Sequence, residues 1–404
     1  MKILVANLGS TSFKYRLFDM GTPAVDAPRQ LARGSVERIG ADVSPCRVEI
    51  GDQVSQLEMA VPHHGVAVEA CLQQLTDPEH GCLKSADEVA GIGFKAVHGG
   101  RLSGVYRVTE EVLQAMEEVA EVAPAHNPPY IAAMRQLAQT VPQIPLVAAF
   151  ETDFHRTIPE PRRRYAIPHP WAEELPIRKW GFHGASHRYI AERSAQLMGR
   201  EDARVISLHL GGSSSLCAIA AGQSVATTMG MSPQSGVPQN NRVGDFDPFT
   251  LPLIMRHTGL SLEQVLHELG TSGGLLGLSA GAGRDLRDLQ QAAAAGNDAA
   301  RLAIDVYVEE IRRHLGGMLV ALGGGDALVF TGGIGENAAD IRAAVCRGLE
   351  QLGIVLDEQR NSQVRAAEAR IDAQRAGAVE IWVIPTNEEL IVARQTAQVL
   401  ASTR

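Results

Sequence analysis

Two segments in opposite halves of the chain share one pattern of apolar and polar positions. In the first, the apolar run 3–6 predicts a buried strand, and the alternation of apolar and charged residues over 13–18 predicts a half-buried return strand. Between them, the polar stretch 7–12 predicts a tight turn. Residues 205–219 repeat this order around the Gly/Ser stretch 211–215. The repeated pattern predicts a duplicated fold.

The tip of the first hairpin is rich in small polar groups. They belong to Asn7, Gly9, Ser10, Thr11 and Ser12. Small side chains leave the backbone N–H groups open to a ligand, and these donors suit an anion such as phosphate. Taken alone, a Gly/Ser turn without a ligand is an equally good interpretation. The second tip shifts this balance, because two hairpins facing one another would clamp a polyphosphate.

Further elements follow from the same periodicities. Buried strands are predicted at 89–98, 145–150, 327–331 and 379–384. Helices are predicted at 66–76, 109–122, from about 130, from about 187 and over 298–322, and residues 385–390 are predicted to open a last helix. The spacing within 298–322 is strongly amphipathic, which indicates a core or subunit-interface helix. The strand at 89–98 places Lys95 and His98 near its end, where α/β folds bind their ligands.

Two loops are candidates for ligand binding. Residues 226–248 form a long stretch without periodicity that contains Arg242, and loops of this length in compact domains are usually functional. Residues 332–337, Gly-Gly-Ile-Gly-Glu-Asn, join a predicted strand to a helix start and resemble a phosphate- or adenosine-binding turn. The sequence contains neither the G-x-G-x-x-G dinucleotide fingerprint nor G-x-x-x-x-G-K-[ST], so any nucleotide site uses another scaffold.

The last predicted helix separates two glutamates. Thr386 and Glu389 have the spacing of a capping box, which gives Glu389 a structural role. Glu388 then remains beside a strand end, where its carboxylate suits Mg²⁺ directly or through water. The alternative is an acid that only complements the helix dipole.

The histidines do not indicate a zinc site or a serine hydrolase. His126, His183 and His187 lie in Pro- or Gly-rich turns without H-E-x-x-H or Cys/His spacing, and no G-x-S-x-G elbow is present. For His98, His155 and His209, near strand ends, structural and functional roles are equally supported.

Length and charge bound the remaining possibilities. The 404 residues suggest two or three domains, and 45% hydrophobic with 21% charged residues fits a soluble globular protein. A formal charge of −9 argues against nucleic acid as a partner. We find no apolar stretch near 18 residues, and the five cysteines form no C-x-x-C pair, so we expect a cytoplasmic protein with reduced thiols, neither secreted nor membrane-spanning.

Together, these motifs resemble the acetate kinase family within the actin, sugar-kinase and Hsp70-like superfamily. The matching segments run along the whole chain: N-x-G-S-x-S-x-K (7–14), VHGG (97–100), HNPP (126–129), GFHG-x-SH (181–187), the turn 211–215, R-x-GD-x-DP (242–248), GGIGEN (332–337) and IPTNEE (384–389). The resemblance implies an α/β fold of two duplicated actin-like, ribonuclease H-like domains. Each has a mixed five-stranded-type sheet flanked by helices, and a catalytic cleft lies between them. Residues 1–150 with 386–404 would form the first domain. Residues 151–385 would form the second, which binds nucleotide and joins a homodimer.

The implied reaction is reversible transfer of the ATP γ-phosphoryl group to acetate or propionate, with Mg²⁺, to give an acyl phosphate. Arg242 would neutralise the phosphoryl group, His183 would donate a hydrogen bond to it, and Lys95 and Glu151 would complete the catalytic set. The resemblance implies phosphate and nucleotide contacts from Asn7, Ser12, Lys14, His209, Gly211, Gly212, Ser213, Asp285, Arg287, Gly333, Ile334, Gly335, Asn337 and Ile341. It implies an acyl pocket lined by Val97, Ala125 and Pro233, and metal binding by Asn7 and Glu388.

Several positions depart from the family pattern. Lys95 replaces an arginine and loses its planar fork, and Glu151 replaces an aspartate near the metal. Gly212 replaces an asparagine, and Asn240-Asn241 replace small residues before Arg242. Ala125 replaces a leucine, so we expect room for propionate or a longer acid.

Two alternatives to a short-chain carboxylate kinase stay open. One is a kinase of the same fold with pyrophosphate as donor or a larger or substituted acid as acceptor. The other is a nucleotide-binding sensor with little catalysis, against which Arg242, His183 and Glu388 argue, because a sensor needs no groups aimed at a transferred phosphoryl.

Overall fold

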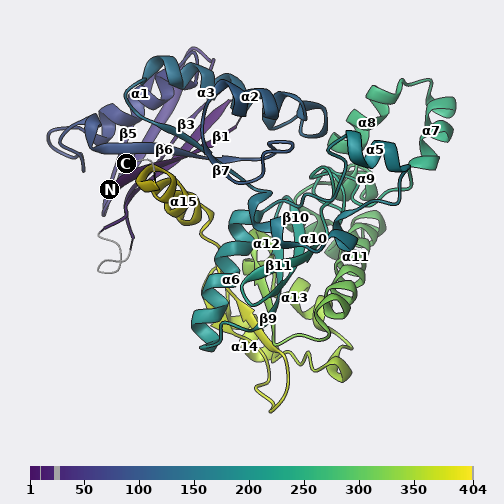
Figure 1. Cartoon of the computed structure of the whole chain (residues 1–404). Coiled ribbons are helices and arrows are strands. Elements are labelled where there is room, and N and C mark those ends of the chain that lie inside the picture. The colour runs from purple at the N-terminus through teal and green to yellow at the C-terminus, as the bar shows by residue number, and fades with distance from the viewer. Residues whose placement is uncertain (10, 22–27, 403–404) are drawn as a thin grey trace. The chain divides into compact units, whose positions relative to one another are not determined.

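The computed structural model describes residues 1–9, 11–21 and 28–402, which form two compact units (Figure 1). Unit 1 comprises Met1–Asp153 and Asn387–Arg404, and unit 2 comprises Phe154–Thr386. Ser10, from the predicted hairpin tip, lies outside the described residues. Among the described residues, we find no helix with both the length and the apolar character needed to cross a membrane.

Unit 1 is built on an eight-stranded sheet with the order β5-β4-β3-β2-β1-β6-β8-β7. Its strands are β1 (Lys2–Leu8), β2 (Ser12–Asp19), β3 (Arg29–Glu37), β4 (Ser44–Ile50), β5 (Gln53–Met59), β6 (Val89–Ala96), β7 (Val105–Arg107) and β8 (Leu146–Phe150). The predicted first hairpin is confirmed, because β1 and β2 pair antiparallel from Lys2 with Asp19 to Leu8 with Phe13.

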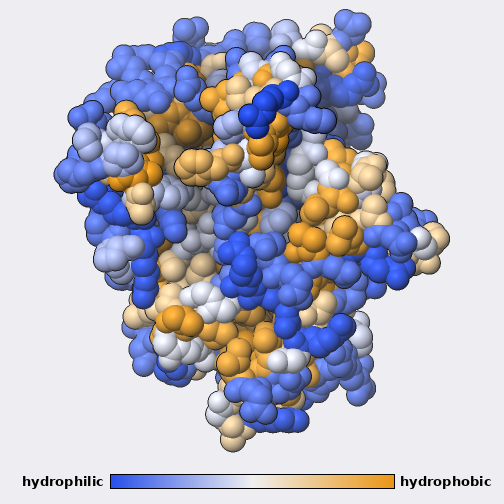
Figure 2. All heavy atoms as spheres, turned by 90° about the vertical axis from the view of Figure 1, so that its right-hand side faces the viewer, coloured by the Kyte–Doolittle hydropathy of each residue, from blue (hydrophilic) through white to orange (hydrophobic). Residues whose placement is uncertain are grey.

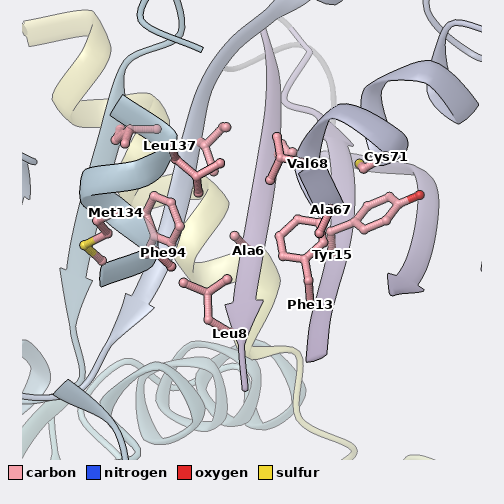
Figure 3. Close-up of a cluster of buried hydrophobic side chains, with 14 of the residues drawn as sticks. Ala6, Leu8, Phe13, Tyr15, Ala67, Val68, Cys71, Phe94, Met134 and Leu137 are labelled. Atoms are coloured by element: carbon pink, nitrogen blue, oxygen red, sulfur yellow. The ribbon is translucent and has the colours of Figure 1, made fainter. Parts of the chain in front are cut away.

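The helices of unit 1 cover both faces of this sheet (Figure 1). They are α1 (His64–Leu75), α2 (Glu110–Glu117), α3 (Asn127–Thr140) and α15 (Glu388–Ser402), with 3₁₀ turns at Ala86–Glu88 and Ala120–Val122. Figure 3 shows Ala67, Val68 and Cys71 of α1 and Met134 and Leu137 of α3 beside the apolar side chains of β1, β2 and β6. Alternate residues of these strands point into this core, as the period of two predicts.

The opposite face of β6 receives α15. A Cβ atom built on Gly93 would stand 2.2 Å from Oγ1 of Thr396, and one on Gly91 would stand 2.5 Å from Cδ1 of Leu400. A larger residue at either position would collide with side chains of α15. These two glycines let the last helix lie directly against the strand that carries Lys95.

Unit 2 contains a six-stranded sheet with the order β11-β10-β9-β12-β14-β13. Its strands are β9 (Arg204–Leu210), β10 (Ser214–Ala220), β11 (Gln223–Thr227), β12 (Ala327–Thr331), β13 (Ala369–Arg370) and β14 (Glu380–Val383). The second hairpin is also confirmed, with β9 and β10 paired from Arg204 with Ala220 to Leu210 with Ser214.

The two sheets share a five-stranded core, which confirms the predicted duplication. In unit 1 the core is β3-β2-β1-β6-β8 and in unit 2 it is β11-β10-β9-β12-β14. In both, the first three strands pair antiparallel and the last three pair parallel. Strands β4, β5, β7 and β13 extend these cores beyond the five expected strands.

Helices also cover both faces of the unit 2 sheet. They are α4 (Glu160–Arg163), α5 (His169–Glu174), α6 (Gly184–Met198), α7 (Leu251–Thr258), α8 (Leu262–Thr271), α9 (Gly274–Leu278), α10 (Leu286–Ala294), α11 (Asp298–Leu322), α12 (Gly332–Asn337), α13 (Ala339–Cys346) and α14 (Glu358–Gln363), with 3₁₀ turns at Asp153–Thr157, Pro248–Thr250 and Glu350–Leu352. The predicted amphipathic helix is confirmed as α11, whose apolar stripe packs on Leu208, Leu216 and Phe330. On the other face, Ile190 of α6 packs against Val205 and Val329.

The predicted starts of α3 and α6 and the predicted cap of α15 differ from the structure. Helix α3 begins at Asn127 rather than near 130, because Pro128 and Pro129 fit its first turn, where a missing N–H costs nothing. The capping box at Thr386 is not formed in the predicted register. Instead, α15 begins at Glu388, and the side chain of Asn387 accepts a hydrogen bond from the N–H of Leu390 at 3.2 Å.

Arg342 in α13 is fully buried and supports the short glycine-rich helix α12. Its guanidinium donates to the carbonyl oxygen of Gly335 at 2.9 Å, to Oδ1 of Asn361 at 2.7 Å, and to the carbonyl oxygens of Asn361 and Val364 at 2.9 and 3.0 Å. Burial lowers the pKa of this guanidinium to about 10. The four acceptors make Arg342 a structural support of the glycine turn.

We predict that Arg342→Met lowers the free energy of unfolding by about 3 kcal/mol or more, because it leaves several buried carbonyl acceptors without a donor. Arg347→Met, at an exposed position shortly after the same helix, is the control and should change it by less than about 0.5 kcal/mol. Urea denaturation of both variants checks this. Equal, small losses would contradict the structural role of Arg342.

Candidate active site

In unit 1, three polar residues gather at one edge of the sheet. Asn7, Lys95 and Glu151 lie at or just beyond the carboxyl ends of β1, β6 and β8, which are neighbouring parallel strands. Carboxyl ends of adjacent parallel strands share an edge, which is where open α/β sheets place their ligands. Glu388 joins this edge as the first residue of α15.

Lys95 and Glu388 form an ion pair. The Lys95 Nζ lies 2.6 Å from Oε2 of Glu388, with side-chain exposures of 22% and 14%. Burial alone would lower the pKa of Lys95, but the carboxylates of Glu388 and Glu151 outweigh it and raise the pKa above its ordinary value. Lys95 is therefore a permanent cation at this edge.

Asn7 is held in place by Tyr130 of α3. The Tyr130 hydroxyl donates to Oδ1 of Asn7 at 3.2 Å and accepts from the N–H of Leu8 at 3.2 Å. Sequence reasoning gave Tyr130 no role, because a tyrosine on a helix is usually a core residue. Lys14, opposite Asn7 in the hairpin, is exposed, and Ser12 opens β2.

The donor set at this edge fits Mg²⁺ in its chemistry. Asn7 offers an amide oxygen, and Glu151 and Glu388 offer carboxylates, the oxygen ligands that this hard cation takes together with waters and phosphates. Among the described residues, no group of three or more His, Cys, Asp or Glu residues stands ready to hold a metal. Mg²⁺ needs only one or two protein carboxylates, so this finding is compatible with it.

In unit 2, the polar face of β9 meets α6. Ile206, Leu208 and Leu210 point into the core under α11, so the alternate residues Ser207 and His209 point to the α6 side. There the hydroxyl of Ser207 lies 2.9 Å from Nδ1 of His187, and that of Ser186 lies 2.8 Å from Nδ1 of His209. The predicted residue His209 is thus oriented by α6.

His183 stands at the N-cap of α6 in the left-handed conformation, with φ 57°. Its Nδ1 lies 2.8 Å from Oγ of Ser215, which lies 2.9 Å from Nε2 of His187. The single Ser215 proton can go to only one ring, so the tautomers of the two histidines are coupled. The ring of His183 also stacks on that of His209, with centroids 4.3 Å apart.

Two histidines behind His183 are buried and neutral. Burial lowers the pKa of His155 to about 4 and lowers that of His187 well below its ordinary value. His155 bonds the carbonyl oxygen of Phe182 through Nε2 and the hydroxyl of Ser224 through Nδ1, both at 2.9 Å. These contacts support the turn that carries His183.

The loop that contains Arg242 has no helix or strand from 228 to 247, as predicted. The Arg242 Nη1 donates to Oε1 of Gln239 at 3.2 Å and to Oγ of Ser213 at 3.4 Å. Gln239, which is buried, is anchored in turn on the carbonyl oxygen of Pro233 at 2.7 Å. Burial lowers the pKa of Arg242, which still leaves a charged guanidinium beside the hairpin tip.

The two glycine turns of unit 2 lie side by side. A Cβ built on Gly211 would stand 3.9 Å from the backbone nitrogen of Gly333 and 3.9 Å from Nε2 of His209. Gly332 has φ +76°, and its Cβ would stand 2.7 Å from the carbonyl oxygen of Leu210, so this position requires glycine. The Asn337 side chain donates to the carbonyl oxygen of Gly333 at 2.9 Å. The arrangement brings His209, Gly211, Ser213, Arg242 and Gly333 together.

The remaining predicted residues of unit 2 are Asp285, Arg287, Ile334, Gly335 and Ile341. Asp285 caps α10 and forms a two-pronged ion pair with exposed Arg287 at 2.9 and 2.7 Å, which lowers the pKa of Asp285 to about 2. Ile334 is half-buried, and Gly335 is buried in α12. Ile341 is buried in the core of unit 2.

In unit 1, the predicted acyl-pocket residues Val97 and Ala125 lie on two loops joined by Asn127. Its side-chain amide donates to the carbonyl oxygens of His98 and Met116, both at 2.8 Å. Val97 is half-buried and Ala125 is exposed.

Comparison with known proteins decides the family of this chain. The profile of the acetokinase family matches residues 2–394. The chain is 42% identical to the acetate kinase of Geobacillus sp. (strain WCH70) over 98% of both chains. It resembles the crystal structure of Porphyromonas gingivalis acetate kinase with a TM-score of 0.87 and 36% identity over 99% of both chains. The crystal structure of a propionate kinase from Francisella tularensis gives a TM-score of 0.86 with 34% identity over 98% of both chains.

The chain belongs to the acetokinase family. Members of this family are phosphotransferases with a carboxyl group as acceptor, and the fold predicted from the sequence is confirmed. For an acetokinase, the residues that sequence reasoning missed are Tyr130, Gln239 and Ser215. Each acts through a side-chain hydrogen bond to a predicted residue, which no motif or spacing reveals.

We predict that the free energy of unfolding falls as the pH decreases from 7 to 4. The unfolded chain takes up a proton on His155 near pH 6.5, whereas the folded chain excludes it until about 4. Stability is thus lost as the pH falls, by up to about 1.4 kcal/mol per pH unit for each such histidine. Urea denaturation at several pH values measures the slope.

His155→Gln should reduce the slope of the unfolding free energy against pH by up to about 1.4 kcal/mol per pH unit, which corresponds to one proton. The control His80→Gln, at a side chain that is 56% exposed, should leave it unchanged. Parallel slopes for the wild type and His155→Gln would show that His155 does not carry the effect.

Proposed function

We propose that this protein is an ATP-dependent carboxylate kinase that transfers the γ-phosphoryl group reversibly to acetate or propionate. The observation that carries the proposal is the convergence of Arg242, His209 and the two glycine turns in unit 2. In an acetokinase, a cation beside open backbone N–H groups is suited to a phosphoryl group. Curated relatives named acetate kinase and a structural neighbour named propionate kinase support the acceptor class.

The proposed step is a direct in-line displacement. A carboxylate oxygen of the acid forms a bond to the γ-phosphorus as the bond to the β-phosphate oxygen breaks, and ADP leaves with that electron pair. Such a transfer needs positioned charge rather than a covalent nucleophile. Arg242 neutralises the equatorial oxygens, and His183 donates a hydrogen bond to them from a ring whose tautomer Ser215 and His187 restrict.

Asn7 and Glu388, with Glu151 nearby, are the residues proposed to hold Mg²⁺ in unit 1. When bound, the ion would neutralise phosphate charge and orient the phosphate oxygens. Lys95 competes for the same carboxylate, because its Nζ lies 2.6 Å from Glu388. Its task in the proposed reaction is to attract the acid's carboxylate and the phosphoryl oxygens to this edge.

We also propose a homodimer formed through unit 2. Helices α7 and α8 with the preceding turn expose apolar side chains, among them Phe249 at 86%, Leu253, Leu262 and Leu266. Figure 2 shows apolar residues exposed over the side of the molecule that carries these helices. Apolar surface of this kind marks an interface. Light scattering that gives the mass of one chain at micromolar concentration would contradict the dimer.

A hydroxamate trap for acyl phosphate tests the function. The enzyme is incubated with Mg²⁺, ATP or pyrophosphate, and acetate, propionate or butyrate, and the acyl hydroxamate is measured. We expect product with ATP and the short acids. Product with pyrophosphate alone would overturn the proposed donor, and nucleotide binding without product would favour the sensor.

We predict that the wild type uses propionate at least as well as acetate, because Ala125 leaves space where a leucine would stand. Ala125→Leu should shift the acetate-to-propionate ratio of kcat/KM about tenfold toward acetate, which corresponds to about 1.4 kcal/mol for the displaced methylene. Ala401→Leu, at an exposed position near the end of α15, is the control. A steady fall of wild-type kcat/KM from acetate to propionate to butyrate would contradict the enlarged pocket.

We predict that Lys95→Arg raises kcat, because the guanidinium can pair with Glu388 and still offer a second N–H to the acid or phosphoryl group. Lys95→Met should lower kcat by about 10²-fold or more, in line with the contribution of a positioned cation to phosphoryl transfer. Lys84→Arg, at an exposed lysine of unit 1, is the matched control. An unchanged or lower kcat in Lys95→Arg would indicate that residue 95 does not bind the acid or the phosphoryl group as the family pattern implies.

A further inference from the structure

The tip of the β9–β10 hairpin carries a glycine beside which the side chain of another residue lies. Gly212 carries no side chain, and a Cβ built on it would stand 3.2 Å from Nδ2 and 3.7 Å from Cγ of Asn240. These are the only heavy atoms within 4 Å of that position among the described residues, apart from Gly212 itself and its chain neighbours. The amide of Asn240 therefore lies in close contact with the position at which a side chain of residue 212 would begin.

Asn240 is held there by its backbone on both sides. Its N–H donates to the carbonyl oxygen of Gly212 at 3.1 Å, and its carbonyl oxygen accepts from the N–H of Leu276 at 3.0 Å. Two residues later, Arg242 reaches Ser213 at the same tip. The backbone thus places the Asn240 amide and the Arg242 guanidinium on one hairpin tip.

The side chain of Asn240 lacks a protein partner that would explain its position. Its Oδ1 is buried and has no hydrogen-bond partner among the described residues. A buried amide oxygen without a partner costs free energy, so packing alone does not account for an asparagine here. A phosphate cannot donate to this oxygen, but hydrogen bonds from the Nδ2 group of the same amide to phosphoryl oxygens would offset the cost of holding the side chain at the tip.

We propose that Asn240 is a phosphate-binding residue, whose amide N–H groups contact the phosphoryl oxygens over the tip 211–213 in place of a side chain at position 212. The inference rests on the proposed function, because it assigns this contact to the transferred phosphoryl group. It also makes Gly212 and Asn240 one unit, because a larger residue at 212 and the side chain of Asn240 compete for the same space.

The experiment compares kcat/KM for ATP, the Kd for ATP and the Tm across a set of variants. Asn240→Ala should lower kcat/KM about 10- to 100-fold, as expected for a lost hydrogen bond to a charged group, and weaken ATP binding. Asn240→Asp keeps the shape but replaces the N–H donors with negative charge, so it should lose more than Asn240→Ala. Both should keep a Tm close to that of the wild type. Asn241→Ala, the adjacent asparagine, is the matched control and should change kcat/KM less than threefold.

The coupling is tested by moving the amide across the tip. Gly212→Asn alone should lower kcat/KM, because the new side chain meets Asn240. The double variant Gly212→Asn with Asn240→Gly should recover most of the wild-type kcat/KM, because one amide again stands over the tip. Such recovery would mean that the effects of the two substitutions on kcat/KM do not add, as they would for independent residues.

The outcomes separate this inference from the proposed function. If the wild type makes no acyl phosphate from ATP, the proposed function fails, and the ATP Kd values of Asn240→Ala and Asn241→Ala still decide whether Asn240 binds phosphate. If the wild type is active, equal kcat/KM in Asn240→Ala and the wild type overturns the role of Asn240. Equal losses in Asn240→Ala and Asn241→Ala, or a double variant no better than Asn240→Gly alone, also overturn it, since they indicate a loop effect.

Discussion

The parallel pairing of the central strands decides where the chemistry of each unit stands. In unit 1, β1, β6 and β8 run in one direction, so Asn7, Lys95 and Glu151 reach the same edge although they are distant in sequence. In unit 2, β9 and β12 are parallel, so the hairpin tip after Leu210 and the turn after Thr331 become neighbours. A shift of one residue in the register of these parallel strands would turn their side chains to the opposite face of the sheet and separate the residues of both groups.

Close packing then brings further elements to these edges. Because Gly91 and Gly93 carry no side chains, α15 lies on β6, and its first residue, Glu388, meets Lys95. In unit 2, the buried hydroxyl of Ser215 connects two histidine rings. Such networks are favourable only when every buried polar group is satisfied, which ties the positions of these residues to one another.

Sequence reasoning reached those parts of the molecule that local patterns encode. Alternating residues predicted both hairpins, and the spacing of four and three predicted α11. It could not reach features set by tertiary contacts. The start of α15 depends on Asn387 rather than on the better-known pattern at Thr386, and the support of Arg242 by Gln239 joins side chains whose spacing carries no motif. Tyr130 looks like any core tyrosine until Asn7 is placed beside its hydroxyl.

The side chains around Gly212 differ in kind from those around Lys95, two of the positions where the chain departs from the family pattern. At Gly212, the amide of Asn240 lies beside the position without a side chain, and we propose that it supplies the phosphate contact there. At Lys95, the charged groups that act on the ammonium are the carboxylates of Glu388 and Glu151. A lysine there satisfies the acidic edge as a point charge but cannot present two parallel N–H donors to a planar carboxylate. In the proposed reaction, a lysine at position 95 therefore changes the chemistry of its site, whereas the proposed pair of Gly212 and Asn240 keeps an amide at the tip and changes only the residue that supplies it.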